Sequence, residues 1–401
     1  MATPAGQIDV ERVRADTPGC SRWAHLNNAG AALITRPVLN AVVRYLQLEA
    51  DIGGYEAESA TEEALERTYR SIASLLNCGH SEIALTSGAS DAWWRAFQAV
   101  PLAPGDRILA SRAEYNANAF ALMQARRSGV VVELVPDDPD GQLDVDRLVA
   151  MLDPSVKLIA VTHMPTSSGL VNPVEEIGRA VADHDALYLV DACQSVGQRP
   201  VDVKRVGCDM LTFTARKFVR GPRGVGALYV RSEVMSQLDD PTFIDSRSAD
   251  WISESQYRLR VDARRFELFE ASFGARVGFG TAVDYALDVG LDLIQDRIAL
   301  LAGNLRSLLA ATVGVTLLDR GSELSALVTF AVDGRESTDV VAHLRSRGVN
   351  TSVVSSRTAQ LDLGSRNVSH GVRASVHYYN TDAELEQLVD AVSEFAAVGR
   401  V

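Results

Sequence analysis

From residue 83 to residue 230 of this 401-residue chain, short apolar segments alternate with amphipathic helical stretches. This order is typical of a mostly parallel α/β sheet that carries helices on both faces. Ligands of such sheets bind beyond the carboxyl ends of the strands, so polar residues at those ends are the first candidates for a site. The predicted strands are Ile83–Thr86, Arg107–Ala110, Val130–Val135, Lys157–Thr162, Leu187–Val190, Met210–Thr214 and Gly226–Val230.

Helical patterns precede this region. Apolar spacing predicts helices at Arg36–Glu49 and Thr61–Leu76, the second of which begins at Thr61 as an N-cap. Residues 1–25 read as an arm and a short entry segment. The predicted division of the chain is a large α/β domain at 26–285 and a small domain formed by 1–25 together with 286–401.

A smaller C-terminal part follows a long helical pattern at Ala286–Thr312. Its final helix is predicted at Asp382–Ala397, where Thr381 is a good N-cap and Glu384 takes the capping-box position. The predicted strands of this part are Ala326–Val332, Asn350–Val354 and Val372–Val376.

Charge and cysteine usage limit the partners. The net charge is −13 and the isoelectric point near 5.1, which disfavours nucleic acid or an anionic membrane. Four cysteines and seven histidines lack the spacing of disulfide frameworks or metal sites, so no metal is expected and a reducing compartment fits. Met1–Val10 does not resemble a signal peptide, and no apolar run has membrane-spanning length. A cytoplasmic protein is expected.

Two charged residues point to pyridoxal 5'-phosphate (PLP). Asp191 directly follows the apolar strand Leu187–Val190, and Lys217 lies among hydroxyl, basic and glycine residues after the next strand. PLP chemistry needs an acid that keeps the pyridine nitrogen protonated and a lysine that binds the aldehyde. Either residue alone is better explained as a strand-edge aspartate or a surface lysine. The two in this order favour a PLP site.

Small residues at Ser87–Ser90 join a strand to a predicted helix at Trp93–Val100. Backbone amides at such a helix N-terminus favour a phosphate, although an ordinary strand–helix turn capped by Ser90 is an equally good explanation. The glycines of Gly221–Gly226 lack dinucleotide-loop spacing and precede a strand, so they indicate a turn leading away from Lys217.

These motifs, from Leu26 to Thr381, resemble the aminotransferase class V family of fold-type-I PLP enzymes, which includes cysteine desulfurases and C–S lyases. The resemblance implies a homodimer, a seven-stranded, mostly parallel sheet in the large domain, and a smaller α+β C-terminal domain. It assigns the cofactor phosphate to Ala89, Ser90, Thr214 and Arg216, the cofactor's phenolic oxygen to Gln194, other cofactor contacts to Tyr115, Thr166, Asp191 and Lys217, and substrate contacts to Asn28, Tyr55 and Arg373.

The catalytic roles fall to Lys217, Asp191 and Tyr115 by this resemblance, and Arg373 would grip the substrate α-carboxylate through a bidentate bond. Tyr115 would stack on the cofactor ring where desulfurases usually carry histidine, and it is a weaker proton relay than histidine. Arg216 also stands at a position that is commonly histidine in desulfurases.

One absence separates the possible reactions. Desulfurases carry a nucleophilic cysteine shortly before the carboxylate-binding arginine, whereas Ser352–Leu363 has none and no cysteine follows Cys208. Together with Gly53–Glu56, Tyr115 and Ala275–Phe279, this absence makes the chain resemble the C–S lyases of the ergothioneine pathway and of natural-product pathways. The expected reaction is β-elimination from an S-substituted cysteine or its sulfoxide. An aminotransferase, an epimerase or a decarboxylating deaminase could use the same site, and a regulator's effector domain lacks support because no basic DNA-binding domain precedes the α/β region.

Overall fold

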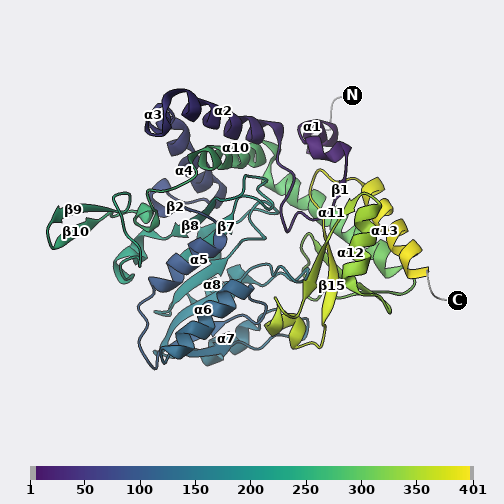
Figure 1. Cartoon of the computed structure of the whole chain (residues 1–401). Helices are drawn as coiled ribbons and strands as arrows, with labels where there is room; N and C mark the ends of the chain where they lie inside the picture. The colour runs from purple at the N-terminus through teal and green to yellow at the C-terminus, as the bar shows by residue number, and fades with distance from the viewer. Residues whose placement is uncertain (1–5, 398–401) are drawn as a thin grey trace.

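A seven-stranded sheet forms the centre of the larger part of the protein, which a computed structural model describes for residues 6–397 (Figure 1). The strand order is β2-β8-β7-β6-β5-β3-β4; β8 is antiparallel to both of its neighbours and the other pairs are parallel. The predicted fold class and the seven predicted strands are confirmed to within one residue at each end. The strands are β2 Ile83–Thr86, β3 Arg107–Ala110, β4 Val131–Leu134, β5 Val156–Thr162, β6 Leu187–Asp191, β7 Met210–Thr214 and β8 Gly226–Val230.

Helices cover both faces of this sheet because its strands are apolar on both faces. In β5, Leu158 and Ala160 enter one hydrophobic core, and Ile159 and Val161 enter the core on the opposite face. The first core is closed by α5 and α6, and the second by α4, α8 and α10. Their bounds are α4 Glu62–Leu76, α5 Ala89–Gln98, α6 Asn116–Arg127, α8 Val174–Val181 and α10 Phe273–Val289; the short helices α7 Val145–Met151 and α9 Val203–Val206 also belong here.

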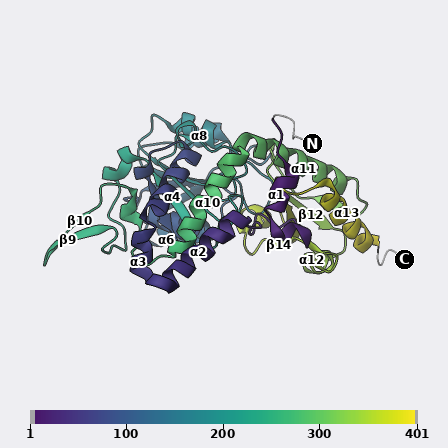
Figure 2. The same cartoon turned by 90° about the horizontal axis from the view of Figure 1, so that it is seen from above.

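Two helices at the start of the chain, α2 (Arg36–Ile52) and α3 (Gly54–Ala60), lie beside α10 and α4 (Figure 2). The helix predicted at 36–49 therefore continues for three further residues. Thr61 does precede α4, but its hydroxyl donates to the carbonyl of Ala57 at 2.7 Å and makes no cap bond to α4. The predicted capping role of Thr61 is wrong because its hydroxyl turns back to the end of α3, where it donates, and accepts from no N–H group of α4.

The C-terminal part holds a separate antiparallel sheet of order β11-β12-β15-β14. The long helical pattern at 286–312 is not one helix, since Gly290, with φ of 93°, ends α10 and begins α11. The predicted cap of the last helix is confirmed: the Glu384 carboxylate accepts from the Thr381 amide at 3.1 Å. The elements are α11 Leu291–Ala310, β11 Val315–Leu317, β12 Leu327–Val332, α12 Ser337–Ser346, β14 Ser352–Ser355, β15 His370–Ser375 and α13 Asp382–Ala397.

The N-terminal segment packs on this C-terminal part. Val13 of α1 (Val10–Ala15) lies in the same core as α11, α12 and α13, and β1 (Ala24–His25) pairs in parallel with β13 (Val349–Asn350). This packing supports our proposal that 1–25 and 286–401 form one small domain and 26–285 the large one.

A hairpin that the sequence pattern did not predict projects from the part of the protein that holds the seven-stranded sheet. It lies at the left of Figure 1. Its strands are β9 Ala249–Ser253 and β10 Gln256–Leu259, and Trp251 is 84% exposed. The hairpin contributes no side chain to the three main cores, which explains why apolar periodicity gave no sign of it.

Arg220 joins the two parts of the protein. It is buried, and its guanidinium donates to the Tyr378 hydroxyl at 2.7 Å, the Leu33 carbonyl at 2.9 Å and the Thr17 hydroxyl. It also lies 4.5 Å from the ring centroid of Tyr379. Its φ of 64° is unusual for a residue with a side chain, so these contacts hold a strained backbone three residues after Lys217.

We expect Arg220→Ala to lower the unfolding free energy by about 3 kcal/mol, because it leaves buried hydroxyl and carbonyl partners without a donor. The apparent Tm, measured by circular dichroism, should fall clearly. Arg223→Ala, an exposed position on the same loop, is the matched control and should leave Tm almost unchanged. Equal values of Tm for the two variants would contradict this role of Arg220.

Candidate active site

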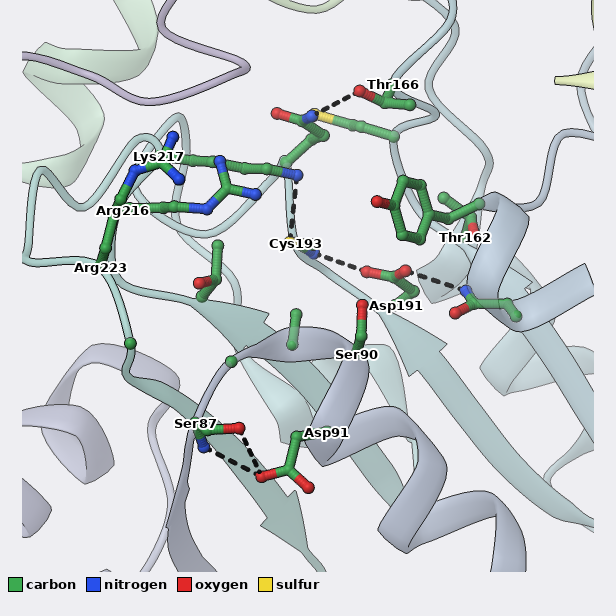
Figure 3. Close-up of a pocket in the computed structure, with 18 residues that line it drawn as sticks. Ser87, Ser90, Asp91, Thr162, Thr166, Asp191, Cys193, Arg216, Lys217 and Arg223 are labelled. Atoms are coloured by element: carbon green, nitrogen blue, oxygen red, sulfur yellow. Dashed lines mark hydrogen bonds between the residues drawn. The ribbon is translucent and has the colours of Figure 1, made fainter. Parts of the chain in front are cut away.

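A cavity of about 290 Å³ lies at the carboxyl ends of β5, β6 and β7 (Figure 3). Nine of the twelve residues predicted for the site line it, although they come from five separate segments of the chain. These nine are Ala89, Ser90, Tyr115, Thr166, Asp191, Gln194, Thr214, Arg216 and Lys217. The strand order of the sheet therefore gathers the proposed cofactor residues in one place.

Asp191 is the last residue of β6 and is fixed by two donors. Its Oδ1 accepts from the Cys193 amide at 2.9 Å, and its Oδ2 accepts from the Asn118 side-chain amide at 2.9 Å. The parallel register aligns Asp191 with Thr162 on β5 and with Thr212 on β7. The carboxylate is thus buried at the floor of the cavity in one orientation.

Lys217 follows β7 and reaches across the cavity. Its Nζ lies 3.2 Å from Sγ of Cys193 and donates to it. The chain has only three lysines, and neither Lys157 nor Lys204 lines the cavity. Burial raises the pKa of the Cys193 thiol, against the opposing effect of the Lys217 charge, so Cys193 is a protonated thiol near neutral pH.

The N-terminus of α5 opens into the same cavity. No side chain caps this helix, so the first backbone N–H groups around Ala89 and Ser90 are free to bind an anion. Gly226 of β8 lets the turn before α5 pack closely against β8, since a Cβ on Gly226 would lie 2.8 Å from Cα of Gly88. Figure 3 shows Lys217 and two arginines, Arg216 and Arg223, on the side of the cavity opposite Ser87 and Asp91.

Thr166 connects the cavity to Arg373 of β15. The Thr166 hydroxyl accepts from the Gln194 amide at 3.0 Å and from the Arg373 guanidinium at 2.6 Å. Two buried polar atoms here have no partner, Oε1 of Gln194 and Nε of Arg373. Burial, together with the nearby Arg216 charge, lowers the pKa of Arg373 to about 10, so the guanidinium remains charged at neutral pH.

Two residues predicted to contact the substrate lie elsewhere. Asn28 is fully buried outside the cavity, where its amide donates to the Ser375 carbonyl at 2.7 Å and its Oδ1 accepts from Tyr379. Its polar atoms are thus engaged in holding the N-terminal segment to β15. Tyr55 is 72% exposed on α3 and does not line the cavity of its own chain. Asn27, the neighbour of Asn28, does approach the site, because its Oδ1 accepts from Arg373 at 3.3 Å.

Sequence reasoning gave no role to Cys193, Asn118 or Glu114. The sequence signal for Cys193 is its place two residues after Asp191, just beyond the end of a strand that leads to the site. Glu114 and Asn118 are four residues apart at the start of α6, a spacing that brings two polar side chains together. Their link to Asp191, 73 residues away from Asn118, depends on the order of the strands.

Residues 24–388 match the family described as aminotransferase class V, and the chain belongs to this family. It is 31% identical to a probable cysteine desulfurase of Xylella fastidiosa strain Temecula1 over 98% of this chain and 96% of the relative. It resembles the apo structure of a cysteine desulfurase from Thermococcus onnurineus NA1, with a TM-score of 0.91, 25% identity and 99% of each chain covered. A cystine C–S lyase solved with cysteine persulfide shares the fold, with a TM-score of 0.84, 21% identity and 94% and 99% of the two chains covered.

Enzymes of this family use PLP, and the groups in the cavity fit it. Asp191 can accept from a protonated ring nitrogen, and the uncapped α5 terminus can receive the phosphate. The Gln194 amide already donates to Thr166 and to the Ala29 carbonyl, so its free Oε1 can only accept. The protein is thus a PLP-dependent enzyme of the class V family. Among residues 6–397, no helix has the length and apolar composition to span a bilayer, and no cluster of His, Cys, Asp or Glu could hold a metal ion.

We expect borohydride reduction of the holoenzyme, followed by peptide mapping, to locate the pyridoxyl group on Lys217. The reason is that Lys217 is the only one of the three lysines that lines the cavity. Lys217→Ala, as the control, should bind the cofactor without a covalent link. A label on Lys157 or Lys204 would refute the assignment.

Proposed function

We propose that this enzyme is a C–S lyase that performs β-elimination on an S-substituted cysteine or its sulfoxide, in the biosynthesis of a sulfur-containing metabolite. The observation that carries the proposal is the absence of cysteine after Cys208. In the segment before Arg373, β14 continues into the π-helical turn Gln360–Gly364, and the Asp362 carboxylate accepts from Ser167 at 2.7 Å. This segment has no thiol that could take up the sulfur.

The residues of the cavity suit such a reaction. Within residues 6–397, Nε of Arg373 has no hydrogen-bond partner, which supports a role in binding the substrate α-carboxylate. Bound PLP would withdraw electrons from Cα and so acidify its proton. Asp191 would hold a proton on the ring nitrogen, while Nζ of Lys217 would remove the Cα proton. The Cβ–S bond would then break with its electron pair on sulfur, and hydrolysis of the three-carbon product would give pyruvate and ammonia.

A cysteine desulfurase is the second candidate, and two observations favour it. Relatives such as the one in Xylella fastidiosa carry that name, and Cys193 lies in the cavity beside Lys217. Against it, burial raises the pKa of the partly buried Cys193 thiol, whereas sulfur uptake requires a thiolate. An aminotransferase, an epimerase or a decarboxylating deaminase would need the same lysine and aspartate.

A side-by-side assay of S-substituted cysteines and free cysteine tests these candidates. We expect pyruvate and released thiol or sulfenic acid from the conjugates, with little sulfide from cysteine. Cys193→Ala should change the rate with conjugates less than about threefold, because the thiol has no chemical part in elimination. Alanine and enzyme-bound persulfide from cysteine, lost in Cys193→Ala, would instead establish the desulfurase. Stoichiometric amino-group exchange with a keto acid would identify an aminotransferase.

We also propose a homodimer in which the apolar outer face of α2 meets a second copy. Leu39, Val43 and Leu46 are each at least 40% exposed, and their spacing of four and three residues puts them on one face of the helix. Tyr55 lies just beyond the end of α2, so a residue predicted for the substrate pocket would serve the partner's site.

Light scattering should give a mass of two chains for the wild type. The double variant Val43→Asp, Leu46→Glu should give the mass of one chain, because charges replace apolar contact. Val313→Glu changes another exposed apolar residue and should remain a dimer. A dimer that survives the double variant with unchanged stability would place the interface elsewhere.

A further inference from the structure

Glu114 is a buried carboxylate beside the cofactor cavity that the proposed reaction does not use. It lies between β3 and α6 and is 6% exposed. Its Oε1 accepts from the Thr162 amide at 2.9 Å and from the Ser111 hydroxyl, and its Oε2 accepts from the Thr162 hydroxyl at 2.7 Å. Within residues 6–397 it has no cation as partner, so burial of its charge is not offset by an ion pair.

A single amide connects Glu114 to Asp191. Nδ2 of Asn118 donates to Oε2 of Glu114 at 3.0 Å and to Oδ2 of Asp191 at 2.9 Å. Both N–H groups of the amide are thereby used. An ionised carboxylate only accepts hydrogen bonds. The NH₂ group of Asn118, and not its oxygen, must therefore lie between the carboxylates of Glu114 and Asp191.

We propose that Glu114 is a positioning residue, which acts through Asn118 to hold the Asp191 carboxylate in the orientation that binds the protonated ring nitrogen of PLP. A helix cap is the simpler role for an acid at this place. However, no side chain caps α6, and the donors to Glu114 lie in Ser111, Asn118 and Thr162. The inference rests on the PLP site and is independent of which sulfur compound is the substrate.

The hydrogen bonds favour the ionised form of Glu114. Burial raises its pKa to about 7, while the bonds from Ser111, Thr162 and Asn118 act in the opposite direction. The N–H groups of the Thr162 backbone amide and the Asn118 side-chain amide can only donate hydrogen bonds. Each donates to a different oxygen of Glu114, and an ionised carboxylate can accept from both.

Glu114→Gln tests the role, since it removes the charge and keeps the size. We expect the absorption band of bound PLP to shift, PLP to dissociate more readily on dialysis, and kcat to fall about tenfold to a hundredfold, as for outer-shell partners of metal ligands. Glu267→Gln is the control at another buried carboxylate: Glu267 lies outside the cavity, accepts from Tyr69 at 2.7 Å and from the Leu85 amide at 2.9 Å, and pairs with Arg276. It should lower Tm and leave the band of PLP unchanged.

A double-mutant cycle with Asn118→Ala separates positioning from a general structural effect. If Glu114 acts through Asn118, Glu114→Gln in the Asn118→Ala background should change PLP retention less than twofold. Additive effects, or a Glu114→Gln enzyme with the wild-type absorption band and PLP affinity, would overturn the proposal. If Glu114→Gln does not fold, Asn118→Ala alone decides, and an unchanged band again overturns it. These spectra need no substrate, so they remain decisive even if the lyase assay fails.

Discussion

The parallel pairing of β5, β6 and β7 is the constraint on which the active site depends. It aligns Thr162, Asp191 and Thr212 across three strands, and it sends each connecting loop to the same edge. Side chains alternate between the two faces, so a slip of one residue in β6 would turn Asp191 to the opposite face and bring Val190 toward the site. The cores resist such a slip because Val190 and Leu189 are fully buried on opposite faces. Packing of the sheet thus fixes the position of Asp191, the proposed catalytic acid.

The active site also depends on contact between the part of the chain that holds the large sheet and the C-terminal part. Arg220 holds the loop after Lys217 against Tyr378, and Arg373 of the small sheet reaches Thr166 of the large one. The Thr166 hydroxyl accepts from both Gln194 and Arg373, so one side chain links the groups proposed for cofactor and substrate. Its two acceptor positions are thereby filled. If Arg373 binds the substrate as proposed, this shared hydroxyl would couple substrate binding to the cofactor site through direct contact.

The large sheet could be predicted because each strand is apolar on both faces and is bounded by polar or glycine-rich turns. The exposed hairpin β9–β10 could not, since its side chains do not enter the main cores and leave no apolar pattern. The nine cavity residues could be predicted because they follow strands or begin helices. Asn28 lies outside the cavity, and its sequence position could not reveal that Tyr379 and Ser375 occupy its amide. The link from Glu114 to Asp191 required the three-dimensional order of strands that are distant in the sequence.

The same network also bears on the choice between sulfur chemistries. Cys193 follows Asp191 by two residues, and its backbone amide donates to that carboxylate. Burial raises the pKa of the Cys193 thiol, and the Asp191 charge raises it further, while Lys217 acts in the opposite direction. The acid that PLP requires therefore disfavours a thiolate at the one cysteine that lines the described cavity. Elimination needs only a base for the Cα proton and a sulfur leaving group on Cβ, and it makes no demand on that thiol. Electrostatics within this cavity thus favours release of the sulfur over its capture by the protein.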